Sequence, residues 1–221
     1  MATAGKLGLN VFVPTPHAHW TPRYLFSRIR QEWWSRSHPE DPWLTRTAVA
    51  FLHEYVRPGD TVVEFGSGRS TMWFARHVGA MGKVISVEAS QDWQKEVVKR
   101  LQAAGMSQAD VQFAAPQPEE YVRSAAERLK HKADAILIDG SVRDACAVWA
   151  VTAVKPGGII VLDNSQHYLP HESRCPKAIP VNGNPKTPLW AEFAAATASW
   201  RKYWTTDGVN DTAVFFAPTG V

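Results

Sequence analysis

The chain has little cysteine, no long apolar run and no apolar leader at its start. Its 221 residues include two cysteines, Cys146 and Cys175, which are too few for a disulfide framework or a cysteine-based zinc site. No apolar run approaches the roughly 18 residues that a membrane helix needs, and residues 1–5 hold no signal-peptide core. We therefore expect a protein of a reducing compartment, the cytoplasm, with no membrane partner.

An excess of charge of one sign is also missing. The chain has 24 lysines and arginines against 21 aspartates and glutamates, without a run of basic residues. Proteins that bind a nucleic-acid backbone usually concentrate such residues, so we expect no nucleic-acid partner. The hydrophobic content of 45% and the length suit one α/β domain with a real core and a short extension.

Short apolar runs alternate with helical patterns from about residue 42 onward. Because strands alternate with helices, we expect parallel pairing with right-handed crossovers. The segments 201–206 and 212–217 flank Asp207-Gly208-Val209-Asn210 and predict a final hairpin. We expect strands at about 61–65, 83–88, 111–114 and 134–139, a fifth after 154, and helices at about 70–78, 90–105, 118–130 and 142–154.

A glycine-rich turn follows the first predicted strand, in Glu64-Phe65-Gly66-Ser67-Gly68. The glycines let the backbone bend sharply and let a ligand approach closely. A buried acid such as Glu64 needs a partner, which a cationic or hydroxyl-bearing ligand could supply. Glu88 ends the next strand about 20 residues later, where an acid can hydrogen-bond ribose hydroxyls. The pattern predicts a nucleotide-like ligand.

These motifs resemble those of the class I S-adenosylmethionine-dependent methyltransferases. The chain matches the family's first motif at residues 64–68 and its ribose-binding acid at Glu88. Residues 135–140 are similar to the family's fourth strand, and residues 154–164 to its fifth strand with the preceding turn. The resemblance covers roughly residues 45–217. It implies an α/β, Rossmann-like, seven-stranded and mostly parallel sheet of order 3-2-1-4-5-7-6, with an antiparallel last strand and helices on both faces.

The resemblance also implies S-adenosyl-L-methionine as the cofactor. Ser70 begins a helix, whose unpaired N–H groups suit the cofactor's carboxylate, although a plain helix cap is the alternative. We expect residues 1–42 to form an aromatic-rich extension or cap, and residues 43–221 to form the methyltransferase domain. The residues expected to bind the cofactor are Glu64, Gly66, Ser67, Gly68, Ser70, Glu88, Ala89, Ala115 and Asp139.

Two side chains are candidates for catalysis. Asp139 closes an apolar strand, and by resemblance it faces the methyl-transfer site; a cap for the next helix is the alternative. His167 lies on a loop rich in proline, asparagine and glycine. Histidine titrates near neutral pH and can deprotonate an acceptor, and the alternative is a solvated loop histidine without a catalytic role.

Asp139, Asp163 and Asn164 match the three metal ligands of the catechol-type O-methyltransferases. Hard oxygen ligands suit Mg²⁺ or Ca²⁺. That family places a catalytic lysine three residues after its first aspartate, whereas this chain has Val142 there, followed by Arg143. Arginine cannot act as a base at neutral pH. We therefore expect no metal, and if one binds we expect these three residues to hold it.

The chain has ten tryptophans, and several gather near its start with other aromatic residues. Such a segment could cap a flat acceptor, or it could pack on the core or on a second subunit in a homodimer. We expect methyl transfer to an oxygen or nitrogen of a small-molecule acceptor. The alternatives are a non-catalytic cofactor-binding or assembly subunit, and a nicotinamide oxidoreductase, although Thr71 replaces the third glycine of that enzyme class's loop.

Overall fold

A computed structural model describes residues 20–219, and within them one sheet has the strand order β3-β2-β1-β4-β5-β7-β6. The strands β1 to β5 pair in parallel, and β7 runs antiparallel to both β5 and β6. The predicted strand order and final hairpin are confirmed. The strands are β1 Thr61–Phe65, β2 Lys83–Glu88, β3 Ala109–Phe113, β4 Ala133–Ile138, β5 Val154–Asp163, β6 Arg201–Thr206 and β7 Asp211–Phe216.

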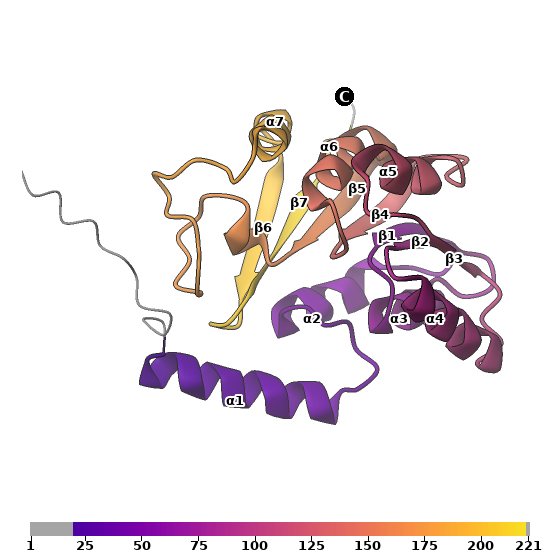
Figure 1. Cartoon of the computed structure of the whole chain (residues 1–221), viewed down its shortest axis with the longest axis horizontal. Coiled ribbons are helices and arrows are strands. Elements are labelled where there is room, and N and C mark those ends of the chain that lie inside the picture. The colour runs from indigo at the N-terminus through magenta and orange to yellow at the C-terminus, as the bar shows by residue number, and fades with distance from the viewer. Residues whose placement is uncertain (1–19, 220–221) are drawn as a thin grey trace, which may run out of the picture.

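Helices cover both faces of the sheet (Figure 1). On one face lie α2 Arg46–Tyr55, α3 Arg69–Val78 and α4 Gln91–Ala103, and on the other lie α5 Pro118–Ala126, α6 Arg143–Ala153 and α7 Pro188–Ala196. The helix α5 ends earlier than the sequence predicted. The sequence pattern also missed the short helix η1 Ser165–His167 and α7, because proline and glycine around them indicated a loop.

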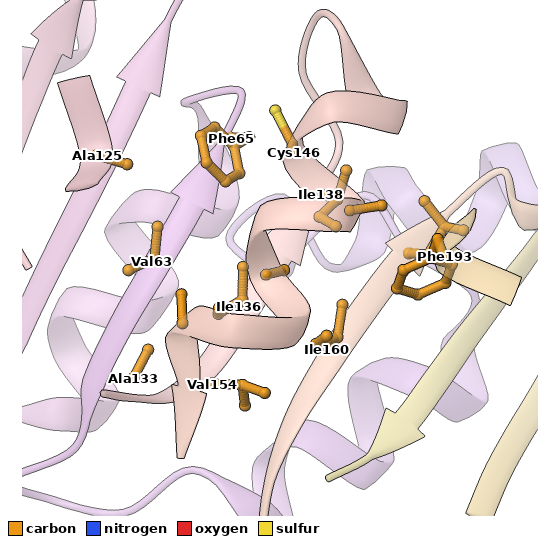
Figure 2. Close-up of a cluster of buried hydrophobic side chains, with 14 of the residues drawn as sticks. Val63, Phe65, Ala125, Ala133, Ile136, Ile138, Cys146, Val154, Ile160 and Phe193 are labelled. Atoms are coloured by element: carbon orange, nitrogen blue, oxygen red, sulfur yellow. The ribbon is translucent and has the colours of Figure 1, made fainter. Parts of the chain in front are cut away.

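Alternating side chains of each central strand enter two separate cores. Val62 of β1 contacts the cluster under α2 and α3, whereas Val63 and Phe65 contact the cluster under α5 and α6 (Figure 2). A strand that is buried on both faces has a continuous run of apolar residues in its sequence. This is why the positions of these strands could be predicted. Cys146 is buried in the second of these clusters, and both cysteines are free thiols.

Two glycines bring the loops after β1 and β4 into contact. Gly66 has a φ of 96°, which glycine adopts without strain. A Cβ atom on Gly66 would lie 2.7 Å from the Cα atom of Gly140, and one on Gly140 would lie 2.6 Å from the backbone nitrogen of Gly66. Larger residues at either position would separate the two loops, so the first glycine of the turn shapes both.

The helix α1 Pro22–Ser37 lies apart from the sheet, along the edge where the parallel strands end (Figure 1). Near its start, the Ser27 hydroxyl lies against Gly208 in the β6–β7 turn, where a Cβ atom would be 2.6 Å away. Near its end, Ser35 accepts a hydrogen bond from Arg69 at 3.2 Å. No helix within residues 20–219 has the length and apolarity to cross a bilayer.

Candidate active site

A cavity of about 490 Å³ opens at the carboxyl ends of β1, β2 and β4. Its volume is in the range of small-molecule and cofactor sites, and its place matches the switch point where open α/β sheets bind ligands. Among the residues predicted to bind the cofactor, the cavity is lined by Gly66, Ser67, Gly68, Ser70, Glu88 and Asp139. The structure therefore brings six of the nine predicted residues together around one space.

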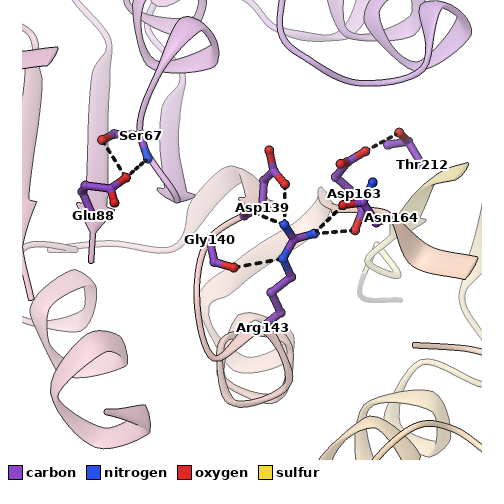
Figure 3. Close-up of polar contacts among 8 residues, drawn as sticks. All are labelled: Ser67, Glu88, Asp139, Gly140, Arg143, Asp163, Asn164 and Thr212. Atoms are coloured by element: carbon purple, nitrogen blue, oxygen red, sulfur yellow. Dashed lines mark hydrogen bonds and ion pairs between the residues drawn. The ribbon is translucent and has the colours of Figure 1, made fainter. Parts of the chain in front are cut away.

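Glu88 is held at the cavity by the glycine turn. Its Oε2 atom accepts hydrogen bonds from the Ser67 backbone at 3.0 Å and the Ser67 hydroxyl at 3.1 Å (Figure 3). Its Oε1 atom accepts one from the Ser90 backbone at 2.8 Å. These bonds fix the carboxylate where β2 ends, and the Oε1 atom keeps lone-pair capacity for a ligand hydroxyl.

Glu64 is fully buried directly beneath the turn. Its Oε2 atom accepts hydrogen bonds from Thr71 and Ser86, whereas Oε1 has no partner within residues 20–219. Burial raises the pKa of Glu64 to about 7, and the nearby hydroxyls of Ser70, Thr71 and Ser86 oppose that rise. A cationic group bound nearby would stabilise the charged form.

Three predicted cofactor residues lie outside the lining of this cavity: the buried Glu64, Ala89 and Ala115. Ala89 packs against the core cluster under α5 and α6. The Ala115 backbone donates a weak hydrogen bond to Glu120 at 3.4 Å. The roles of these residues in cofactor binding stay predictions.

Arg143 occupies the space between Asp139 and Asn164 (Figure 3). Its Nη2 atom donates to the Asp139 carboxylate and backbone carbonyl, both at 2.7 Å. Its Nη1 atom donates to the Asp163 carbonyl at 2.8 Å and to Asn164 Oδ1 at 3.4 Å. Nε donates to the Gly140 carbonyl at 2.9 Å, so all five N–H donors of the guanidinium are used.

The sequence analysis considered Arg143 only as a base and missed this role. The guanidinium is a cation that ties the ends of β4 and β5 together, at the position where the resemblance had suggested a divalent ion. Within residues 20–219, no group of three histidine, cysteine, aspartate or glutamate side chains could hold a metal ion. Val142 precedes Arg143 with a φ of 42°, a strained conformation for a β-branched residue.

The two aspartates beside Arg143 differ in their surroundings. Burial raises the pKa of Asp163 well above its usual value, and the neighbouring Asp139 raises it further. Burial also raises the pKa of Asp139, but the Arg143 guanidinium opposes this rise. The Thr212 hydroxyl donates to Asp163 at 3.0 Å. Because only Asp139 receives the guanidinium on its carboxylate, the negative charge of the pair is best placed there.

Residues 63–165 match a family model described as a methyltransferase domain. This range contains Glu64, the glycine turn, Glu88, Asp139 and Arg143. Over these residues the chain contains a methyltransferase domain. Fold, glycine turn and family match together support an enzyme that uses S-adenosylmethionine, as the sequence predicted.

Solved structures share the fold of this methyltransferase. An O-methyltransferase from Bacillus cereus, in complex with SAH, is 18% identical with a TM-score of 0.57, covering 94% of this chain and 93% of that chain. The O-methyltransferase TomG from Streptomyces achromogenes, in complex with SAM, is 17% identical with a TM-score of 0.57, covering 90% of each chain. Aeropyrum pernix fibrillarin is 12% identical with a TM-score of 0.53, covering 78% and 74%. Identities this low show the fold alone.

His167 is not among the residues that line the cavity at the glycine turn. It lies in η1, with its Nε2 atom 3.4 Å from the Gln166 amide nitrogen. Burial lowers the pKa of His167, and Lys186 and Lys177 lower it further. Its catalytic role stays a prediction, while Asp139 is the predicted catalytic residue that faces the cavity.

Two tryptophans that the sequence analysis did not assign to the cofactor also line the methyltransferase's cavity. Trp43 is 65% exposed, and the Cζ atom of Arg69 lies 5.8 Å from the centroid of its ring. Trp93 is 40% exposed. The Trp93 indole donates to the Ser67 carbonyl at 2.8 Å, bracing the glycine turn. The sequence could have indicated Trp93 by its position, because it lies in the first turn of the helix that follows Glu88.

Replacing Glu88 with alanine should weaken S-adenosylmethionine binding by about tenfold or more. The change removes hydrogen bonds to a charged group, worth roughly 1.5–3 kcal/mol. Calorimetry of the folded variant measures this directly. Glu119→Ala, which removes an exposed acid of α5, serves as the matched control and should bind normally. Unchanged affinity in Glu88→Ala would reject the ribose assignment.

Proposed function

We propose that this methyltransferase transfers a methyl group to an oxygen or nitrogen of a small-molecule acceptor without a resident metal ion. The observation that carries the proposal is the saturated Arg143 guanidinium between Asp139 and Asn164. A divalent ion at the same place would have to displace a cation that makes five hydrogen bonds. The arginine supplies the positive charge that would otherwise be missing beside Asp139.

The cofactor fits the residues around the cavity. Glu88 and Ser67 would hold ribose hydroxyls, and the unpartnered Glu64 oxygen suits the cofactor's amino group. The first turn of α3, with Ser70, would hold its carboxylate. When bound, S-adenosylmethionine supplies an electrophilic methyl group, and the sulfur keeps the bonding electron pair.

Asp139 serves as the general base in this proposal. Its carboxylate lines the cofactor cavity and is oriented by Arg143 at 2.7 Å. It takes the proton from the acceptor's O–H or N–H group, which frees the lone pair that attacks the methyl carbon. Asp163 is buried and accepts a hydrogen bond from the Thr212 hydroxyl. This bond holds the Asp163 carboxyl group in place beside Asp139.

The described part of the predicted extension supports a role near the acceptor. A second hollow of about 980 Å³ lies between α1, residues 171–178 and the β6–β7 turn. Both it and the cofactor cavity lie at the carboxyl edge of the sheet. We therefore propose that the N-terminal segment up to residue 42 shapes the acceptor side of the site.

The direct test is methyl transfer to a panel of phenols, carboxylic acids and amines, with and without EDTA. We expect turnover of at least one small acceptor, unchanged by exhaustive chelation. Loss of turnover on chelation and its return with Mg²⁺ would contradict the metal-free site. No turnover of any acceptor, with cofactor binding intact, would favour the alternative of a non-catalytic cofactor-binding subunit.

A further inference from the structure

The helix α1 carries large apolar residues on its exposed face, whereas a helix that only packs on a core carries them on its buried face. Phe26, Ile29 and Trp33 recur at helical spacing and therefore share one face. They are 66%, 70% and 70% exposed. The opposite face carries the buried or partly buried positions of the helix, which are Tyr24, Ser27, Gln31, Trp34 and Ser35. Ile29 and Trp33 thus point away from the protein, while Phe26 is exposed and also lines the hollow beside α1.

Positive charge flanks this outward face, because Arg23, Arg30 and Arg36 lie three or four residues from Phe26 or Trp33, whereas Arg28 donates to Gln31 on the opposite face. The helix contains Arg23, Arg28, Arg30 and Arg36, with Glu32 as its one acid. Within residues 20–219, Arg36 pairs with Glu32, whereas no ion pair involves the other three arginines, although Arg30 lies near Asp207. The first acid of the whole chain is Glu32.

We propose that α1 seats the methyltransferase on an anionic lipid surface. An exposed face of tryptophan, phenylalanine and isoleucine inserts at the boundary between headgroups and acyl chains. Arginines beside it extend their apolar stems along that face and place their guanidinium groups among the headgroup phosphates. The helix lies on the bilayer without crossing it, and this mode of binding needs no long apolar run.

A second copy of the chain is the less suitable occupant of this face. A symmetric dimer pairs the same patch of both copies. It would bring the arginines of one α1 helix against those of the other, with one glutamate per helix to offset them. Like charges placed together at an interface oppose association. An anionic surface complements the same charges.

The position of α1 links this surface to the enzyme's site. The helix contacts Gly208 in the β6–β7 turn at one end and Arg69, which lines the cofactor cavity, at the other. Seating α1 on lipid therefore places the carboxyl edge of the sheet toward the membrane (Figure 1). The inference concerns location and stands independently of which acceptor is methylated.

The test is co-sedimentation of the full chain with lipid vesicles. We expect partition into phosphatidylcholine vesicles that contain about 30% phosphatidylglycerol, and much weaker partition into pure phosphatidylcholine. Raising the salt from about 0.1 M to about 0.5 M should reduce the partition, because charge attraction is screened. Equal sedimentation with both vesicle types, or with neither, would overturn the proposal.

The double change Ile29→Glu with Trp33→Glu should reduce partition by about tenfold or more. Met81→Glu is the matched control, because Met81 is 85% exposed in the turn between α3 and β2, at the opposite edge of the sheet; it should bind as the unchanged protein does. Arg36→Gln, which removes a cation beside Ile29 and Trp33, should weaken partition about fivefold. S-adenosylmethionine titration verifies that each variant is folded.

Undiminished lipid binding by the double variant would reject α1 as the contact. Gel filtration adds a second readout on the same proteins. A concentration-dependent dimer that the double variant loses would show that the face joins two copies, and this outcome also overturns the lipid assignment.

Discussion

Changing Asp139 to asparagine should reduce methyl transfer by about 10²–10⁴-fold, the usual contribution of a general base. Asparagine keeps the size of the side chain and can still accept a hydrogen bond from Arg143, so the fold should persist. Steady-state assays on an acceptor found in the panel, with melting temperature measured in parallel, provide the comparison. Asp139→Asn protein that turns over normally would exclude the carboxylate as base.

The pH profile adds a readout that a purely structural role would not move. Asp139 must be deprotonated to act, so activity should rise with pH through its pKa and then level off. Burial raises that pKa and Arg143 opposes the rise, so Arg143→Met should move the rising limb to higher pH. An unshifted limb in a folded Arg143→Met protein would contradict the coupling between these two side chains.

Deleting residues 1–40 should abolish methyl transfer while leaving a folded protein that binds S-adenosylmethionine. The buried core begins at Leu44, and Ser27 is the one buried residue of α1. The deletion nevertheless removes the wall that α1 contributes to the hollow at the carboxyl edge. Some loss of melting temperature is expected, because Trp34 contacts the core under α2 and α3.

Three measurements on the truncated protein separate the possible roles. Loss of folding, cofactor binding and turnover together would identify the segment as structural packing. Retained turnover of the true acceptor would reject the cap. The ion pair between Glu40 and Arg76 at 2.6 Å allows a milder control, because Arg76→Ala loosens the end of the segment without removing it and should have a small effect.

The residues at and around the glycine turn were easier to predict than the contacts that hold them in place. Glu64, Gly66, Gly68 and Glu88 lie in one short stretch whose strand–turn–helix pattern is local. Thr71 and Ser86, which hold Glu64, were missed because a hydroxyl in a helix or strand carries no signal of its partner. Ala89 and Ala115 were assigned from their place after a strand, which does not determine what they contact.

Arg143 was the main omission. Its hydrogen bonds reach Asp163 and Asn164, about 20 residues along the chain, because β4 and β5 are neighbours whose ends meet at one edge of the sheet. The sequence placed Asp139, Asp163 and Asn164 at that edge. It did not indicate that an arginine four residues after Asp139 would turn back between them.

The sequence by itself determined the sheet, the glycine turn and the acids that flank it, because periodicity and glycine act over a few residues of backbone. Tertiary structure alone decided that a guanidinium lies between Asp139 and Asn164 and that Phe26, Ile29 and Trp33 face outward. Helical spacing shows that side chains share a face but not which face meets the protein. That choice depends on how separate elements dock, and docking is set by contacts between residues far apart in the chain.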